Sequence, residues 1–362
     1  MFYYLSTLSD LFFGFNIFRY ITFRSGMAAV TTFLLCIIFG PIFIKKLQQF
    51  KIQEIAQRQD CPDLNKFMHS KQGTPTMGGI FIVGSVLISV LLWADLSNPF
   101  ILLTSFTCLW LAVLGAIDDV QKLTGKGEHR GMTVRRKIFW QLVLGFLIGI
   151  FVYLCPDTST KLDIPFFKNS LIDLGIFYIF FVALIIVGTS NAVNLTDGLD
   201  GLAIGCVLIV TLTLGVLSYI TGHLFFSHYL FIPHVSGAGE LTVFCAALIG
   251  ASLGFLWFNC YPASIFMGDV GSLALGGSLG VVAVLIKKEL LLILLGGVFV
   301  VEALSVIVQV VSFKATGKRL FKMSPFHHHL QMSGWNESKI IIRFWIAAII
   351  LALLTLTTLK IR

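Results

Sequence analysis

The chain has 362 residues, of which 57% are hydrophobic and 12% are charged, and its mean hydropathy is +0.91. Because a soluble domain carries about 25% charged residues, this composition excludes a soluble enzyme and indicates an integral membrane protein. The formal net charge is +8, and no nucleic-acid partner is predicted. Nothing in the pattern resembles a second, soluble domain, so we predict a single integral membrane domain over residues 1–362.

The first 20 residues differ from the rest of the chain. They are aromatic and are interrupted by Asp10, Gly14 and Asn16, with no basic region ahead of an apolar core. We predict that residues 1–20 form an interfacial N-terminal segment rather than a cleaved signal. The seven cysteines show no C-x-x-C spacing, which implies neither a disulfide framework nor a zinc site.

Ten apolar stretches of near-spanning length follow. A backbone in lipid must satisfy its own hydrogen bonds, which helices do, so we predict an all-α polytopic membrane protein with about ten transmembrane helices. The predicted spans are about 22–44, 77–96, 99–117, 138–155, 171–190, 200–220, 240–258, 270–286, 290–311 and 341–359.

The basic residues predict the orientation of these spans. Seventeen Lys and Arg residues lie in three alternate loops, 44–76, 118–137 and 312–340, against eight in the segments on the other side. Since basic loops stay in the cytoplasm, we expect both termini outside and these three loops inside.

The polar segment Asn191-Ala-Val-Asn-Leu-Thr-Asp-Gly-Leu-Asp-Gly201 interrupts two long apolar runs. Its carboxylates lie at membrane depth, where they need a partner such as a metal ion, a donor-rich ligand or a proton path. Asp197 lies in the middle of the predicted loop, although Asp-Gly is also ordinary turn chemistry. Asp200 could instead be the N-cap of the next helix. With Asn191, Asn194 and Gly198, these residues are candidates for substrate binding.

Two further carboxylate motifs fall on the same predicted face. Asp118 and Asp119 end the third span, where the helix dipole disfavours negative charge. They either pair with Lys122 or bind Mg²⁺ that bridges to a diphosphate. Asp269 lies in Phe266-Met-Gly-Asp269 and is a metal-ligand candidate or an N-cap. Asn259 and Phe266 are nearby binding candidates, although packing or capping also explains them.

Two other motifs carry no carboxylate. Lys71-Gln-Gly-Thr-Pro-Thr-Met-Gly-Gly79 combines a lysine, hydroxyls such as that of Thr76, and glycines that would suit a phosphate or nucleotide, but is also ordinary at a helix start. His327, His328 and His329 are consecutive. Their side chains would point about 100° apart on a helix, which makes a poor single-metal site, so we favour contacts to a substrate phosphate or sugar.

Carboxylates, histidines and basic loops thus converge on one membrane face. Anionic phosphates would be repelled by the carboxylates unless Mg²⁺ bridged them. The pattern therefore favours metal-assisted phosphoryl transfer at the cytoplasmic membrane surface. An ion-coupled transporter is the alternative, but it predicts midplane charges and internal symmetry, and the carboxylates lie at span ends.

These motifs, in this order and from about residue 20 onward, resemble those of the phospho-N-acetylmuramoyl-pentapeptide transferases, the bacterial translocase I family. The resemblance implies Mg²⁺-dependent transfer from UDP-N-acetylmuramoyl-pentapeptide to undecaprenyl phosphate, giving lipid I and UMP. It also implies ten helices in the bacterial inner membrane, contact with membrane lipid, a cytoplasmic active site and a homodimer.

The same resemblance implies residue roles. Asp269 is similar to the Mg²⁺ ligand, and Asp118 and Asp119 to catalytic acids near the lipid phosphate. The remaining matched positions resemble nucleotide-sugar contacts (Asn194, Asp197), a uracil pocket (Lys71, Gly198, Asp200, Phe266) and contacts near the diphosphate (His327, His328). One position departs from the family: Gln331 stands where an acid is usual.

We expect direct attack by the lipid phosphate on the phosphorus attached to the sugar, with Asp118 deprotonating or orienting the lipid phosphate. A two-step route through an aspartyl-phosphate is the alternative. The closest competing activity is that of a polyprenyl-phosphate N-acetylhexosamine-1-phosphate transferase for another surface polymer. The Thr-Pro-Thr-Met-Gly-Gly and Pro-x-His-His-His motifs favour the muramoyl-pentapeptide enzyme.

Overall fold

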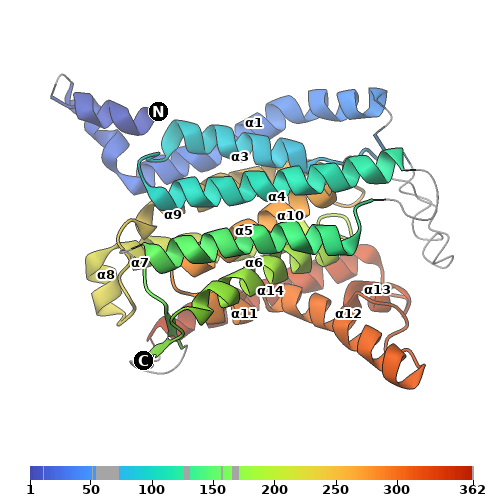
Figure 1. Ribbon diagram of the computed structural model, residues 1–362. Coiled ribbons are helices and arrows are strands. Elements are labelled where there is room, and N and C mark those ends of the chain that lie inside the picture. The colour runs from blue at the N-terminus through green and yellow to red at the C-terminus, as the bar shows by residue number, and fades with distance from the viewer. Residues whose placement is uncertain are drawn as a thin grey trace.

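The computed structural model describes residues 1–10, 12–50, 52–53, 73–125, 131–155, 158–164 and 171–360. The chain forms a bundle of long helices with both ends at the same side of the bundle, on the left in Figure 1. The long helices are α1 (Ile21–Gln49), α4 (Pro99–Thr124), α5 (Val134–Leu154), α6 (Phe177–Thr196), α7 (Leu202–Gly222), α9 (Leu241–Asn259), α10 (Gly268–Leu285), α12 (Gly297–Thr316) and α14 (Glu337–Thr357).

Shorter elements complete the described chain. They are the 3₁₀ helices η1 (Phe2–Leu8), η2 (Phe13–Arg19), η4 (Ala238–Glu240) and η5 (Thr358–Lys360), the helices α3 (Gly79–Trp93), α8 (Leu224–Tyr229), α11 (Glu289–Leu295) and α13 (Phe326–Gln331), and the antiparallel strands β1 (Lys161–Asp163) and β2 (Leu171–Asp173).

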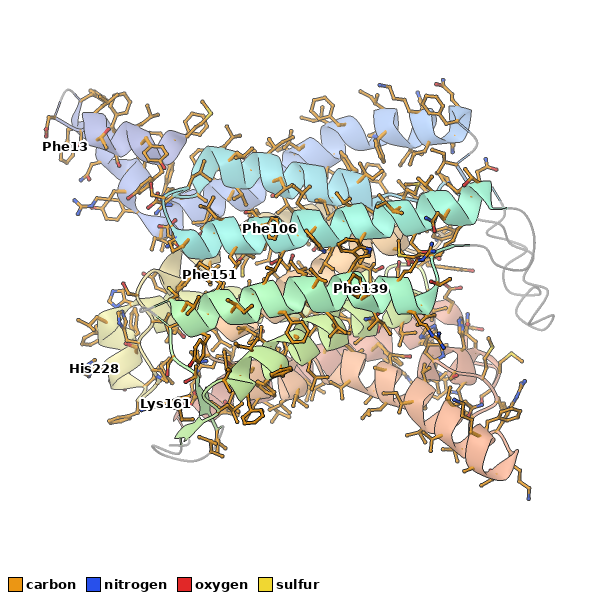
Figure 2. All side chains as sticks on the ribbon, in the orientation of Figure 1. Phe13, Phe106, Phe139, Phe151, Lys161 and His228 are labelled. Atoms are coloured by element: carbon orange, nitrogen blue, oxygen red, sulfur yellow. The ribbon has the colours of Figure 1, made fainter. Side chains whose placement is uncertain are left out.

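Nine of the ten predicted spans each coincide with one helix, and the predicted span 290–311 is divided between α11 and α12 at Gly296. The all-α polytopic membrane fold is confirmed. Among the described residues, nine helices are long and apolar enough to cross a bilayer, and α3 is shorter with 15 residues. Figure 2 shows apolar side chains such as Phe106 and Phe139 projecting from the outside of the bundle. Phe139 is 58% exposed, as expected for a lipid-facing side chain.

Several boundaries differ from the predicted ones, and the differences matter for the site. Helix α4 continues beyond residue 117 to Thr124, so Asp118 and Asp119 lie inside a helix. Helix α6 begins at Phe177, after the strand β2, and continues to Thr196. The polar segment 191–201 is therefore half helix, and only its last residues form a turn.

Helix α10 is the centre of the bundle, and every residue from Val270 to Leu285 is buried. Glycines allow its neighbours to come close. A Cβ on Gly79 of α3 would lie 2.0 Å from the backbone nitrogen of Gly271, and one on Gly115 of α4 would lie 2.3 Å from the backbone oxygen of Asp269. Close backbone approach at small residues is the usual packing mode of membrane helices.

Two lysines in the turn after α10 hold the strand β1 and the residues just before it. Lys288 Nζ donates to Asp163 Oδ2 at 2.6 Å, and Lys287 Nζ donates to the backbone oxygen of Ser159 at 2.6 Å. Both lysines are buried, and burial lowers the pKa of Lys287. Lys161 on β1 lies at the same side of the bundle as the termini in Figure 2.

We predict that Gly115→Ala lowers the apparent melting temperature in detergent, because the new methyl group would collide with backbone that cannot move aside. Overpacking of this kind costs about 1–3 kcal/mol. Gly84→Ala is the matched control, since a Cβ on Gly84 of α3 meets nothing within 4 Å. Thermal unfolding of the two variants, followed by intrinsic fluorescence, makes the comparison; equal melting temperatures would contradict the prediction.

Candidate active site

Three carboxylates converge where the C-terminal half of α4 meets the start of α10. Asp118 and Asp119 are buried, at 3% and 6% exposure, and Asp269 lies in the first turn of α10. Asp119 Oδ2 accepts a hydrogen bond from the backbone nitrogen of Val270 at 3.2 Å. Asp118 Oδ1 accepts one from the backbone nitrogen of Met132 at 2.6 Å. The aspartates of α4 therefore hold both the start of α10 and the segment before α5.

Two lysines neutralise most of this charge. Lys122 Nζ lies 3.1 Å from Asp118 Oδ2, 3.6 Å from Asp119 Oδ1 and 2.9 Å from Asp269 Oδ1. Lys137 Nζ, from α5, lies 2.5 Å from Asp269 Oδ2 and 3.3 Å from Asp118 Oδ2. The pairing of Asp118 with Lys122 that the spacing allows is confirmed, and the same lysine also reaches Asp269.

Helix α6 adds an amide to the cluster. Asn194 Nδ2 lies 3.0 Å from Asp269 Oδ1 and 2.8 Å from Ser272 Oγ. Asn191, one turn earlier, points elsewhere, and its amide donates to Gln141 Oε1 on α5 at 2.8 Å. The two asparagines of the polar segment thus have different surroundings, and only Asn194 touches the carboxylates.

The turn after α6 is fastened to the loop before α10. Asp200 Oδ2 accepts from the backbone nitrogen of Ala263 at 3.0 Å, and Asn259 Oδ1 accepts from that of Gly201 at 3.0 Å. Asn259 Nδ2 donates to the backbone oxygen of Ile265 at 2.8 Å. Asp197 is the C-cap residue of α6, and Gly198 next to it is exposed.

The segment that precedes α3 lies against the same loop. The backbone nitrogen of Phe266 donates to Pro75 at 2.8 Å, and that of Gly78 donates back to Phe266 at 2.9 Å. Thr76 Oγ1 lies next to Gly268, within 3.3 Å of the position that a Cβ there would take. Thr76 and Phe266 are therefore close to the carboxylates, whereas Lys71 lies outside the described residues.

The three histidines, on α13, have different environments. His327 is fully buried and pairs with Glu302 of α12, its Nδ1 lying 3.0 Å from Glu302 Oε2. His328 Nδ1 lies 2.8 Å from Gln331 Oε1, so the amide that replaces the usual acid contacts this histidine. His329 Nδ1 accepts from the backbone nitrogen of Lys322 at 3.2 Å. The three rings thus have three different partners and do not face one common point. This agrees with the prediction that three consecutive histidines make a poor single-metal site.

Lys137, Ser272 and Glu302 lie in the site or beside it, and we did not predict roles for them from the sequence. Lys137 is one of many basic loop residues, and nothing local marks it as a partner of Asp269. Glu302 carried a readable signal, because it is an acid inside the apolar run Val300-Val-Glu-Ala303 and acids inside membrane helices rarely lack a function.

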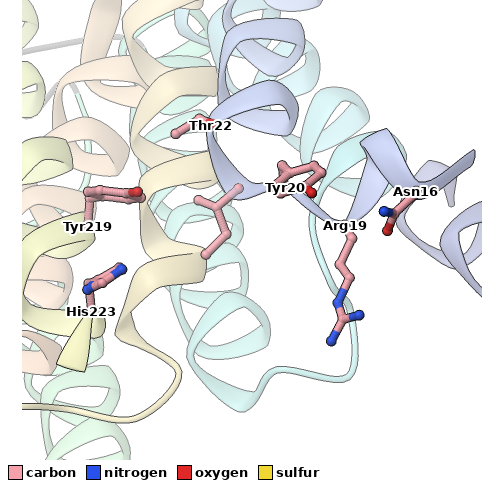
Figure 3. Close-up of a pocket in the computed structure, with 7 residues that line it drawn as sticks. Asn16, Arg19, Tyr20, Thr22, Tyr219 and His223 are labelled. Atoms are coloured by element: carbon pink, nitrogen blue, oxygen red, sulfur yellow. The ribbon is translucent and has the colours of Figure 1, made fainter. Parts of the chain in front are cut away.

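A pocket of about 390 Å³ lies elsewhere, lined by residues 16 and 19–22 on one side and by Tyr219 and His223 on the other (Figure 3). Tyr219 and His223 lie at the end of α7, whereas Gly201 and Asp200 precede its start. Since α7 spans the bundle, this pocket is separate from the carboxylate cluster.

The matches to known proteins agree with the motifs. Residues 71–83 match signature 1 of phospho-N-acetylmuramoyl-pentapeptide-transferase, and residues 101–287 match Glycosyl transferase family 4. The phospho-N-acetylmuramoyl-pentapeptide-transferase of Desulforapulum autotrophicum is 51% identical over 363 residues and covers 100% of both chains. That of Citrifermentans bemidjiense is 53% identical over 348 residues and covers 96% of both chains.

The chain belongs to the phospho-N-acetylmuramoyl-pentapeptide-transferase family. It is therefore a transferase of peptidoglycan synthesis. The alternative prediction, an ion-coupled transporter, is wrong. The phospho-N-acetylmuramoyl-pentapeptide-transferase signature covers the segment that packs against Phe266, and the longer match covers both α4 and the start of α10. Full-length identity extends the likeness to the histidines of α13.

We predict that Asn259→Ala lowers the free energy of unfolding by about 2 kcal/mol or more. The substitution removes the hydrogen-bond partner of two buried backbone groups, the nitrogen of Gly201 and the oxygen of Ile265. Asn336→Ala is the control: Asn336 is exposed, at the start of α14, and its side chain makes no cap hydrogen bond. Thermal unfolding in detergent makes the measurement. Unchanged stability together with lost activity would instead make Asn259 a direct substrate contact.

Proposed function

We propose that this protein transfers phospho-N-acetylmuramoyl-pentapeptide from its UDP-linked precursor to undecaprenyl phosphate, giving lipid I and UMP. The relatives at about 50% identity carry the name of this transferase. The observation that carries the proposal for the site is the convergence of three carboxylates and two lysines at one end of the bundle. Phosphoryl transfer needs such a site, because its catalysis consists mainly of positioning and charge stabilisation.

Mg²⁺ is the cofactor that these donors favour. Within the described residues no cluster of three or more His, Cys, Asp or Glu side chains forms a metal site as it stands. The carboxylate oxygens of Asp269 and Asp118 are nevertheless gathered around two cationic groups, and hard oxygen donors suit Mg²⁺. Asp269 would hold the ion in the place that the Lys122 ammonium group takes. We choose Lys122 as the lysine that moves away because its side chain is 43% exposed, whereas that of Lys137 is only 14% exposed.

When bound, Mg²⁺ would neutralise charge on the diphosphate of the donor. The chain's own residues would do the rest. Lys137, which is held between Asp118 and Asp269, would face the phosphates with a fixed positive charge. Asn194 and Asp197 would contact the nucleotide sugar. Gly198, Phe266, Asp200 and Lys71 would form or support the uracil pocket. His327 and His328 would lie near the diphosphate, and His329 would contact the phosphates or the sugar.

The proposed reaction is a single displacement. An oxygen of the lipid phosphate attacks the phosphorus attached to the sugar, a new P–O bond forms, and the P–O bond to UMP breaks. Asp118 accepts the proton of the lipid phosphate or orients it, since its Oδ2 lies 3.1 Å from the ammonium group of Lys122 and 3.3 Å from that of Lys137, next to the place proposed for the phosphates. Asp119 supports the start of α10 through Val270, so we assign it to positioning.

The proposed site faces the cytoplasm of the bacterial inner membrane. The carboxylate cluster lies at the end of α4 that leads into the basic loop 118–137, and positive charge marks the cytoplasmic side. The lipid acceptor would approach through the membrane, along the exposed apolar faces of the long helices. The homodimer that the family resemblance implies stays a prediction.

We predict that Asp269→Asn reduces transfer by about 100-fold or more, because a charged ligand of the diphosphate site is lost. The assay measures lipid I and UMP in detergent, with and without Mg²⁺, for the parent and the variant. Asp173→Asn is the control, since Asp173 is an exposed carboxylate on β2. Turnover of UDP-N-acetylglucosamine alone, or transfer that EDTA does not reduce, would contradict the proposal.

We predict that no UMP is released when undecaprenyl phosphate is left out. A single displacement breaks the bond to UMP only as the lipid phosphate attacks, so the donor alone should give no product. Rapid-quench measurement with radiolabelled UDP-N-acetylmuramoyl-pentapeptide tests this. A burst of UMP stoichiometric with the enzyme would instead establish a covalent intermediate, and its loss in Asp118→Asn but not Asp119→Asn would assign the nucleophile.

A further inference from the structure

Glu302 is a carboxylate buried inside the membrane-spanning helix α12. Its side chain is 0% exposed, and an ionised acid in such a place needs a partner. The partner is His327 at the start of α13: its backbone nitrogen lies 3.2 Å from Glu302 Oε1, and its ring Nδ1 lies 3.0 Å from Oε2. One carboxylate thus holds both the backbone and the ring of this histidine.

This pairing determines which ring nitrogen of His327 stays available. A carboxylate only accepts hydrogen bonds, so Nδ1 carries a hydrogen and donates it to Glu302. Within the part of the chain that the structure describes, Nε2 of His327 is buried and has no hydrogen-bond partner. A buried polar atom without a partner is uncommon in proteins and calls for an explanation.

The unpartnered nitrogen points at the substrate loop of the proposed function. A Cβ on Gly198 would lie 2.3 Å from His327 Nε2, so the ring edge lies directly against the turn after α6. Gly198 follows Asp197 and is itself exposed on its other side. His328 lies beside His327, with the two ring centroids 4.2 Å apart.

We propose that Glu302 is a positioning residue for the transferase reaction: it orients His327 through Nδ1 and places a negative charge behind the ring, so that Nε2–H is donated to an anionic phosphate oxygen of the nucleotide when the turn at Gly198 adjusts to it. The proposal rests on the proposed function, because it needs a phosphate at this turn. A carboxylate behind a histidine fixes tautomer and orientation in the same way in catalytic triads and metal sites.

Ligand binding to the parent and to Glu302→Gln tests this inference. Glutamine has nearly the same shape and keeps an acceptor for Nδ1, but it carries no charge. We expect UMP to bind about 10- to 100-fold more weakly to the variant, with uridine binding unchanged, because only UMP has the phosphate. Titration calorimetry in detergent gives both values, and Glu302→Asp, which restores the charge, should recover part of the UMP affinity.

The double variant Glu302→Gln/His327→Gln tests whether the loss of UMP affinity in Glu302→Gln acts through His327 or comes from a general disturbance of the fold. If Glu302 acts through His327, the double variant binds UMP no more weakly than His327→Gln alone. Additive losses, or equal losses for UMP and uridine, would overturn the proposal. If Glu302→Gln fails to fold, His327→Gln alone carries the same UMP and uridine comparison, and an unchanged UMP affinity in that variant would overturn the proposal. If the parent protein binds UMP but forms no lipid I, the proposed function is wrong, and the UMP and uridine affinities of the variants can still be compared.

Discussion

Three carboxylates close together at the end of a membrane bundle repel one another, and the structure depends on how that repulsion is relieved. Lys122 and Lys137 lie between the carboxylates and bring the ends of α4, α5 and α10 to one point. Backbone donors from Val270 and Met132 complete the arrangement. The same groups that hold the helix ends together are those that would bind a metal ion and a diphosphate, so stability and proposed chemistry share one set of charges.

The glycines of α10 and its neighbours make that convergence possible. Gly115 lets α4 reach the backbone of Asp269, and Gly79 lets α3 reach Gly271. With bulkier residues at these positions the helices would stand further apart, and the carboxylates of α4 could not meet the one on α10. Packing at small residues in the bundle centre thus positions polar groups at its end.

Several polar residues that look like substrate contacts in the sequence fasten loops to one another in the structure. Asp200 and Asn259 tie the turn after α6 to the loop before α10, and Asn191 ties α6 to α5. These internal contacts shape the walls of the site. Their predicted roles in binding stay predictions, and a wall residue can also touch a ligand.

The sequence by itself determined the membrane fold, because composition and apolar run length leave helices as the way for such segments to satisfy their backbone in lipid. It also placed Asp118, Asp119 and Asp269 at one end of the bundle, since alternate spans return to the same side, although Asp118 and Asp119 lie inside α4 and not at its end. It did not reveal the strands β1 and β2, the length of α4, or the pairing of Lys137 with Asp269 and of Glu302 with His327. Those depend on which side chains meet when distant helices pack, and a local pattern of residues carries no information about a partner 132 or 25 positions away. Only the tertiary structure decided them.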